Sequence, residues 1–201
     1  MDELDLLDWK RRVFTLYASA RAAADPAAAH AGWIRARDEL FAEHPQSPLA
    51  GPGRAGFRGL AYYGYDPTLR RLADVVPADE ELRRIGASDG GSIVFRRFAA
   101  ARFELGGDLR SLDLFWLEGY GGGVFLPFAD ATSGHETYGG GRYLLDTVKG
   151  ADLGVEDGRL VLDFNFAYNP SCAYDSRWAC PLAPPGSRLG VPVRAGERLV
   201  P

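Results

Sequence analysis

The segment Ala101–Leu117, with the sequence ARFELGGDLRSLDLFWL, decides the class of fold. The runs Ala101–Leu105 and Leu109–Leu117 have the composition of β-strands. Between them, Gly106-Gly107-Asp108 is a turn sequence short enough to join two antiparallel neighbours. The segment therefore predicts a β-hairpin near the middle of the chain.

Further strands are expected on both sides of this hairpin, with glycine between most of them. They cover residues 69–76, 93–98, 124–128, 141–148, 159–167 and 190–194. Asp157-Gly158 is a typical hairpin turn just before the 159–167 strand. Many short strands without βαβ alternation predict an antiparallel sandwich or small barrel, and argue against a doubly wound sheet.

The first 44 residues predict two helices. Leu6, Trp9 and Val13 recur at helical spacing and form an apolar stripe on the first helix. Asp25-Pro26 has the pattern of an N-cap followed by proline at the first helical position of the second helix. These stripes need a partner surface, so the helices are expected to pack against the sheet.

The expected fold is mainly β, in the α+β class: an antiparallel β-barrel or sandwich with an N-terminal two-helix arm. The arm covers residues 1–44 and the β-rich domain residues 45–201, and the two are expected to form one structural unit. Residues 45–59 are rich in proline and glycine and are expected to form a loop.

Composition excludes several classes of partner. The chain has 201 residues and a formal net charge of −4, without a basic stripe, so neither nucleic acid nor a membrane is expected as a partner. The N-terminal sequence MDELDLLDWK lacks the basic start and apolar core of a signal peptide, which predicts a cytoplasmic protein. The oligomeric state does not follow from the sequence.

Two copies of a Tyr-Gly-Gly-Gly motif, beginning at Tyr120 and Tyr138, predict equivalent bends that lead into neighbouring strands. At Gly139–Gly141 the chain either turns a sharp corner or approaches a ligand with its backbone N–H groups. Neither copy is a phosphate loop, because no Gly-Lys-Ser/Thr follows.

The strand 159–167 carries the most informative polar residues. If it alternates throughout, Asp163 and Asn165 lie on one face and the phenylalanines on the other. Arg142 on another expected strand would then pair with Asp163, and together they would receive an anionic or carbonyl group. The alternative is an ordinary ion pair on a solvent-facing strand.

An irregular, aromatic and proline-rich loop is expected after Tyr168. A rigid loop of this kind either builds a pocket or fills the end of a barrel. Cys172 and Cys180 are expected to be thiols, although their spacing permits a disulfide if the loop doubles back. The sequence offers no close-spaced ligand pair, so neither a metal nor a cofactor is expected.

Glu136 and Asp163 are the candidate catalytic groups. They would form an acid–base couple if burial separated their pKa values. The alternative for Glu136 is a solvated loop residue, or a hydrogen-bond acceptor that fixes the adjacent glycine bend.

Two C-terminal runs carry a family resemblance. They are FADATSGHETYGGGRY at residues 128–143 and LDFNFAYNPSCAY at residues 162–174, the latter followed by Cys180-Pro181. Together they closely resemble the microbial family known as Domain of Unknown Function 1684. FAEHPQSP at 41–48 and GLAYY at 59–63 also look like its N-terminal part, so the resemblance covers nearly the whole chain. It implies no established activity.

The resulting hypothesis is a site for a small polar or anionic molecule in a β-barrel cup. Catalysis by Glu136 or Asp163 is left open. The alternative is a structural or partner-binding module whose motifs only stabilise the fold. The expected binding residues are Tyr138, Arg142, Asn165, Tyr168, Asn169, Cys172 and Tyr174.

Overall fold

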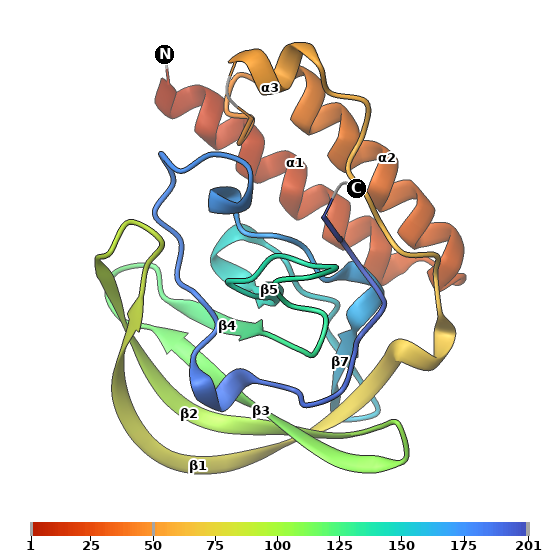
Figure 1. Ribbon diagram of the computed structural model, residues 1–201. Helices are drawn as coiled ribbons and strands as arrows, with labels where there is room; N and C mark the ends of the chain where they lie inside the picture. The colour runs from red at the N-terminus through yellow and green to blue at the C-terminus, as the bar shows by residue number, and fades with distance from the viewer. Residues whose placement is uncertain (1, 50, 200–201) are drawn as a thin grey trace.

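One seven-stranded antiparallel sheet dominates the computed structural model, which describes residues 2–49 and 51–199 (Figure 1). The strand order is β5-β4-β3-β2-β1-β7-β6. The sheet is open, with β5 and β6 as its two edges, so the expected α+β class is confirmed but a closed barrel is not. The strands are β1 Arg70–Gly86, β2 Ser92–Leu105, β3 Asp108–Leu117, β4 Gly123–Phe128, β5 Arg142–Asp146, β6 Val155–Glu156 and β7 Arg159–Asp163.

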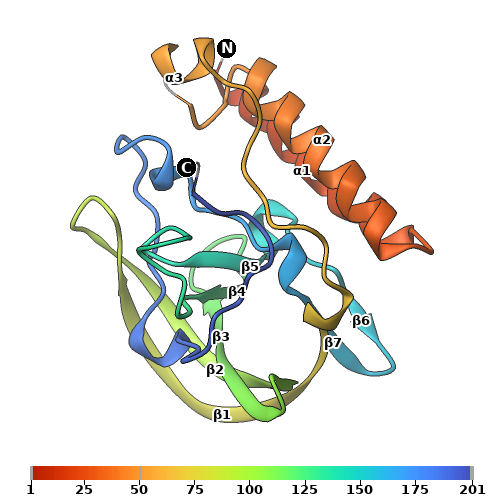
Figure 2. The same cartoon turned by 45° about the vertical axis from the view of Figure 1, so that its right-hand side comes forward.

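The predicted central hairpin is confirmed. Leu105 pairs with Asp108 across a turn in which Gly106 and Gly107 both have positive φ angles. The register of β1 and β2 shifts between Pro77 and Glu81, and irregularities of this kind bend a strand. The sheet accordingly curves, with its hollow side facing the helices (Figure 2).

The two expected helices are also present, as α1 Asp2–Ala22 and α2 Pro26–Glu43. The Asp25 side chain accepts hydrogen bonds from the N–H groups of Ala27 and Ala28, which confirms it as the N-cap. A short helix, α3 Gly51–Ala55, interrupts the segment expected to be a loop. Arg54 Nε from this helix donates to the Ala42 carbonyl near the end of α2, 2.7 Å away.

Two strand predictions were wrong, the first only in its C-terminal part and the second entirely. β7 ends at Asp163, because its carboxylate accepts the N–H of Asn165 at 3.0 Å and starts a 3₁₀ turn. Residues 190–194 form no strand, since Pro192 lacks an N–H group and the Val193 carbonyl accepts from a buried arginine. The 3₁₀ helices are η1 Pro67–Leu69, η2 Thr147–Lys149, η3 Phe164–Phe166, η4 Ser171–Ala173 and η5 Pro185–Ser187.

Two hydrophobic clusters connect these layers. One fills the hollow of the sheet with aliphatic and phenylalanine side chains, and residues 189–195 of the C-terminal segment contribute to it. The other is largely aromatic and joins Tyr17 of α1 and Trp33 of α2 to the sheet, where Tyr143 and Tyr168 are among their neighbours. The helices are therefore an integral layer of the fold (Figures 1 and 2).

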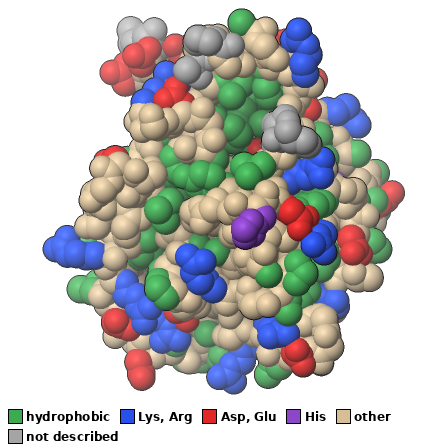
Figure 3. All heavy atoms as spheres, in the orientation of Figure 1, with side chains coloured by type: hydrophobic (Ala, Val, Ile, Leu, Met, Phe, Trp, Pro, Cys, Tyr) green, Lys and Arg blue, Asp and Glu red, His purple; other side chains and the backbone are tan. Residues whose placement is uncertain are grey.

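On the face shown in Figure 3, basic and acidic side chains are interspersed, and hydrophobic side chains gather over the helical part. Within residues 2–49 and 51–199, no helix combines the length and apolar character that a bilayer crossing requires.

Two glycines with similar φ angles separate backbone strain from steric crowding. Gly158 (φ 74°) has open space around it, whereas a Cβ on Gly196 (φ 72°) would lie 2.5 Å from the Ala167 carbonyl oxygen. We expect Gly158→Ala to lower the free energy of unfolding by about 1–2 kcal/mol, the cost of a left-handed alanine. Gly196→Ala should lower the free energy of unfolding by about 1–3 kcal/mol more than Gly158→Ala, because the added methyl group also overpacks the close contact between residue 196 and the Ala167 backbone. Urea denaturation of both variants measures the difference, and equal losses would contradict the close approach.

Candidate functional site

Arg142 is a buried structural residue. Its side chain is 1% exposed, and Nη2 forms an ion pair with Asp130 Oδ2 at 2.6 Å. The guanidinium also donates to the backbone carbonyls of Val193, Ala195 and Glu197. Burial lowers the pKa of Arg142, and the Asp130 carboxylate opposes that shift. A guanidinium with this set of acceptors is committed to the protein itself.

The expected pairing of Arg142 with Asp163 is therefore wrong. Asp163 Oδ1 accepts from the backbone N–H and the side-chain amide of Asn165, at 3.0 and 2.7 Å. Asn165 is fully buried, and its amide also donates to the Asp66 carbonyl at 2.8 Å. These contacts form because the chain turns after Asp163, where continued alternation had been expected.

Glu136 is partly exposed and paired at the surface. Arg194 forms a bidentate contact with its carboxylate, at 2.9 Å from Nε and 2.8 Å from Nη2, and the Tyr63 hydroxyl donates to it at 2.9 Å. These hydrogen bonds, with Arg194 the largest contributor, lower the pKa of Glu136 to about 2. A carboxylate so stabilised in its ionised form is a poor proton-transfer group.

Tyr168, Asn169 and Tyr174 lie together. Tyr168 exchanges backbone hydrogen bonds with Tyr143 of β5 at 2.9 and 3.1 Å, which places the loop beside the sheet edge. The Glu197 carboxylate, buried behind the loop, accepts from the Asn169 backbone N–H at 3.0 Å and from the Tyr174 hydroxyl.

Arg37 of α2 completes this network. Its Nη2 donates to Glu197 Oε2 at 2.8 Å, and its Nε donates to the Tyr62 hydroxyl at 2.9 Å. The guanidinium carbon lies 5.1 Å from the centre of the Tyr168 ring. Burial raises the pKa of Glu197, and the Arg37 charge opposes that effect. The network thus connects the helical layer to the loop.

A groove separates α1 from this loop, and we call it the α1 groove. It has two adjoining parts, which we call the inner chamber (about 70 Å³) and the outer part (about 280 Å³), and both are bordered by Trp9, Val13, Pro48, Lys149 and Ser171. Tyr17, Tyr168, Asn169 and Tyr174 line the inner chamber, whereas Trp178 and Cys180 line the outer part.

Two polar atoms on residues that line the inner chamber form no hydrogen bond in the structure. The Tyr17 hydroxyl and Asn169 Oδ1 are both buried, on side chains of residues that are 2% and 5% exposed. Neither makes a hydrogen bond of good geometry within the described part of the chain, although the Trp33 indole lies close enough to the Tyr17 hydroxyl to oppose the rise in its pKa that burial causes. An unpaired buried polar group costs about 1–3 kcal/mol, so a hydrogen-bonding partner at either atom would stabilise the folded protein.

The charged residues that line the α1 groove are all cationic. They are Lys10, Arg37 and Lys149, with no Asp or Glu among the described lining residues. Lys149 is about half exposed, contacts Asp146 at 2.9 Å and lies 5.6 Å from the Tyr143 ring centre. Burial lowers the pKa of Lys149, but the Asp146 charge outweighs it and leaves the pKa raised.

The cysteines are free thiols. Cys180 Sγ accepts from the Cys172 backbone N–H at 3.3 Å, and burial raises the pKa of Cys180 to about 11. Cys172 Sγ lies 3.5 Å from the Tyr138 hydroxyl, whose pKa is raised to about 12 by burial and then by Cys172. Cys180 and Tyr138 therefore stay protonated at neutral pH.

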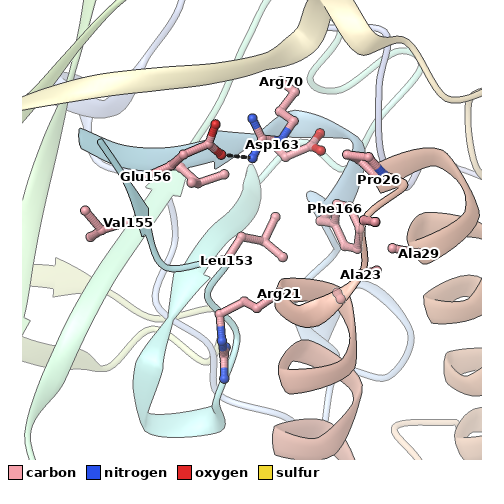
Figure 4. Close-up of a pocket in the computed structure, with 13 residues that line it drawn as sticks. Arg21, Ala23, Pro26, Ala29, Arg70, Leu153, Val155, Glu156, Asp163 and Phe166 are labelled. Atoms are coloured by element: carbon pink, nitrogen blue, oxygen red, sulfur yellow. Dashed lines mark hydrogen bonds and ion pairs between the residues drawn. The ribbon is translucent and has the colours of Figure 1, made fainter. Parts of the chain in front are cut away.

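A second cavity, of about 460 Å³, lies where the α1–α2 connection meets the β6–β7 hairpin, and we call it the Asp163 cavity (Figure 4). Arg70, Glu156 and Asp163 gather at one end of it, and Leu153 and Phe166 form apolar wall. Burial raises the pKa of Asp163, whereas its hydrogen bonds from Asn165 oppose the shift.

The structure thus distributes the expected residues over separate places. Tyr168, Asn169 and Tyr174 share the α1 groove, Asp163 lines the second cavity, and Arg142 is enclosed in the core. Asn165 is fully buried and bonded to Asp163. Sequence analysis missed Tyr17, Arg37 and Lys149 in the groove, as well as Asp130 and Glu197. Asp130 lies within the family motif and could have been identified there. Tyr17 follows Val13 at helical spacing, so nothing in the sequence distinguishes it from ordinary core residues of the first helix.

No metal centre emerges from the part of the chain that the structure describes, because no three His, Cys, Asp or Glu side chains converge suitably there.

The fold and its groove define an α+β protein in which two helices cover one side of a curved antiparallel sheet. The family model for the protein of unknown function DUF1684 matches residues 55–198, and the chain belongs to this family. It is also similar to an uncharacterised protein of Haloarcula marismortui, solved by NMR in solution. The two share 36% identity with a TM-score of 0.61, over 84% of this chain and 91% of the other. No curated protein matches the chain.

Removing the Arg142 guanidinium tests its structural role. Arg142→Met leaves the Asp130 carboxylate and three backbone carbonyls without their buried donor. We expect the free energy of unfolding to fall by about 3–5 kcal/mol. In the matched control Arg194→Met, the exposed pair with Glu136 is lost, and the fall should be below about 1 kcal/mol. Equal losses in urea denaturation would contradict the assignment.

The lowered pKa of Glu136 predicts a defined pH dependence. Because its pKa falls from an ordinary 4.5 to about 2 on folding, ionised Glu136 stabilises the folded state above pH 4.5. That contribution is lost as the pH falls towards 2. A carboxyl ¹³C NMR titration of Glu136 should have its midpoint at about pH 2. Arg194→Gln should raise that midpoint. A wild-type midpoint near 4.5 would show that the bidentate contact is absent in solution.

Proposed function

We propose that the protein binds a small anionic molecule in the α1 groove. The observation that carries this proposal is the pair of unpartnered polar atoms, Tyr17 Oη and Asn169 Oδ1, on two residues that line the inner chamber. A hydroxyl that lacks an acceptor and an amide oxygen that lacks a donor are both satisfied by one ligand carrying an acceptor and a donor.

The lining charges favour an anion. Lys10 and Lys149 line the outer part and no carboxylate does, although the whole chain has a net charge of −4. Arg37 lies deeper, but its contacts with Glu197 and Tyr62 already use its donors on that side. Lys149, which lines both parts, and Lys10 are therefore the cations that can meet a ligand carboxylate in the outer part.

The aromatic side chains that line the α1 groove favour a ligand with a planar ring. Trp9 lines both parts of the groove, and Trp178 faces the outer part. The Trp178 indole N–H donates to the carbonyl of Pro48, after α2, at 3.1 Å, and this hydrogen bond fixes the orientation of the ring. The inner chamber has room only for the polar end of a ligand, so a planar apolar body would lie in the outer part. A small hydroxylated aromatic carboxylate combines these properties.

We propose binding without catalysis at this site. A general base has to lie within hydrogen-bond reach of the proton that it removes. Glu136 is paired with Arg194, and Asp163 lines a different cavity. The described groove lining supplies neither a carboxylate nor a histidine.

One observation favours partner binding as a second candidate function. Leu4, Leu7 and Phe14 follow one another at helical spacing on α1, and each is between 42% and 58% exposed. Trp33 of α2 is buried in the aromatic cluster and is not part of this stripe. A partner protein would cover the exposed stripe without occupying the α1 groove.

Tyr17→Phe tests the ligand proposal by separating stability from affinity. Removing an unpaired buried hydroxyl should raise the free energy of unfolding of the ligand-free protein, by about 1 kcal/mol. The same change should weaken the binding of 4-hydroxybenzoate about tenfold, because the ligand loses a hydrogen bond. Calorimetric titration measures the affinity, and urea denaturation the stability.

The matched control is Tyr63→Phe. Its hydroxyl contacts Glu136 outside the groove, so this variant should bind 4-hydroxybenzoate as the wild type does. Lys149→Met should also weaken binding, since it removes a cation that lines both parts of the groove. The proposal fails if no member of a panel of hydroxybenzoates stabilises the wild type in a thermal-shift assay, where a ligand at 100 times its Kd adds about 2.7 kcal/mol.

A further inference from the structure

The Asp163 cavity brings together a cation and an anion from directly opposed strand positions. Arg70 of β1 and Asp163 of β7 are register partners, so their side chains project from the same side of the sheet. Opposite charges in this relation ordinarily pair with each other. Figure 4 shows both side chains at the same end of the cavity.

These two residues nevertheless form no ion pair in the structure as described. Arg70 Nη2 contacts Glu156 Oε2 at 2.6 Å instead. This contact uses one of the guanidinium nitrogens, and an arginine has five N–H donors. Because Glu156 is about half exposed, the pair with Arg70 lies in solvent and is readily exchanged for another anion.

One carboxylate oxygen of Asp163 has unused hydrogen-bond acceptor capacity. Oδ1 accepts both hydrogen bonds from Asn165, whereas Oδ2 has only a long contact of 3.4 Å from the Tyr65 hydroxyl. The residue is 1% exposed and lines the cavity, so an incoming donor would meet a buried carboxylate oxygen with unused acceptor capacity. A cationic ligand group satisfies it best.

We propose that the Asp163 cavity binds a free α-amino acid with an apolar side chain. The ammonium group contacts Asp163 Oδ2, and the carboxylate contacts Arg70, replacing Glu156. An α-amino acid carries an ammonium and a carboxylate group on the same carbon atom, which matches a pair of directly opposed residues. This site is separate from the α1 groove and adds a second ligand to the proposed function.

The remaining walls select the side chain. Leu153, Val161 and Phe166 line the cavity together with Ala20 and Ala29, and Arg21 points its guanidinium away to contact the Asp152 carbonyl at 2.8 Å. The volume of about 460 Å³ lies within the range of about 300–1,000 Å³ typical of small-molecule sites. A branched aliphatic side chain fits this lining better than a polar one.

Calorimetric titration of the full chain with L-leucine and three analogues tests the proposal. 4-Methylpentanoate lacks the amino group, 3-methylbutylamine lacks the carboxylate, and glycine lacks the side chain. We expect L-leucine to bind at least tenfold more tightly than each of them. Failure of L-leucine and other apolar amino acids to bind, or equal binding of 4-methylpentanoate, overturns the proposal.

Three variants place the binding in this cavity. Asp163→Asn keeps an oxygen for the Asn165 N–H but loses the charge, and should weaken leucine binding at least tenfold. Arg70→Gln should do the same. Arg110→Gln is the matched control, because this arginine pairs with Asp108 in the turn between β2 and β3 and lies outside the cavity.

Ala29→Leu keeps the result interpretable if the charge variants unfold. It places a larger aliphatic side chain from α2 in the cavity and leaves every polar group in place, so it should weaken leucine binding at least tenfold while the protein remains folded. Unchanged binding in this variant overturns the assignment. Tyr17→Phe should bind leucine as the wild type does, which separates a failure here from a failure at the α1 groove.

Discussion

The buried guanidinium of Arg142 is the constraint on which the rest of the structure depends. It joins β5 to the C-terminal segment through Asp130 and the carbonyls of Val193, Ala195 and Glu197. A buried charge is tolerable only where such acceptors surround it, so the path of residues 193–197 is fixed by the position of one side chain. No further strand is added beyond β5, which is an edge of the sheet. The Tyr168 loop lies beside this edge, where Tyr168 exchanges backbone hydrogen bonds with Tyr143.

Glu197 extends this constraint to the helices. Its carbonyl accepts from Arg142, while its carboxylate accepts from Arg37 of α2, the Asn169 backbone and Tyr174. The floor of the α1 groove is therefore built from the same buried polar network that connects the sheet to the helical layer. Networks of this kind specify one arrangement when their members are satisfied. The unpartnered atoms Tyr17 Oη and Asn169 Oδ1 lie next to it, where an occupant would complete the set.

The sequence predicted the local elements well, because each depended on neighbouring residues. The central glycine turn, the Asp157-Gly158 hairpin and the Asp25 cap were all found where expected. Two errors were local, namely helix α3 and the turn that Asp163 starts at the end of β7. The other errors concern partners distant in the chain. Alternation suggested that Arg142 faces Asp163, but which acceptors enclose a guanidinium depends on the path of residues 193–197, and no periodicity encodes that path. The groove was anticipated only through Tyr168, Asn169 and Tyr174, since its other wall comes from an amphipathic helix whose stripe looks like ordinary core.

Helix α1 borders both hollows: Trp9, Val13 and Tyr17 face the groove, whereas Ala20 and Arg21 face the Asp163 cavity one or two turns further along. One helix therefore forms a wall of both hollows, and any substitution that displaces α1 alters the lining of each at once. The two hollows differ in the charges that line them, since the groove carries cations and the Asp163 cavity carries charges of both signs.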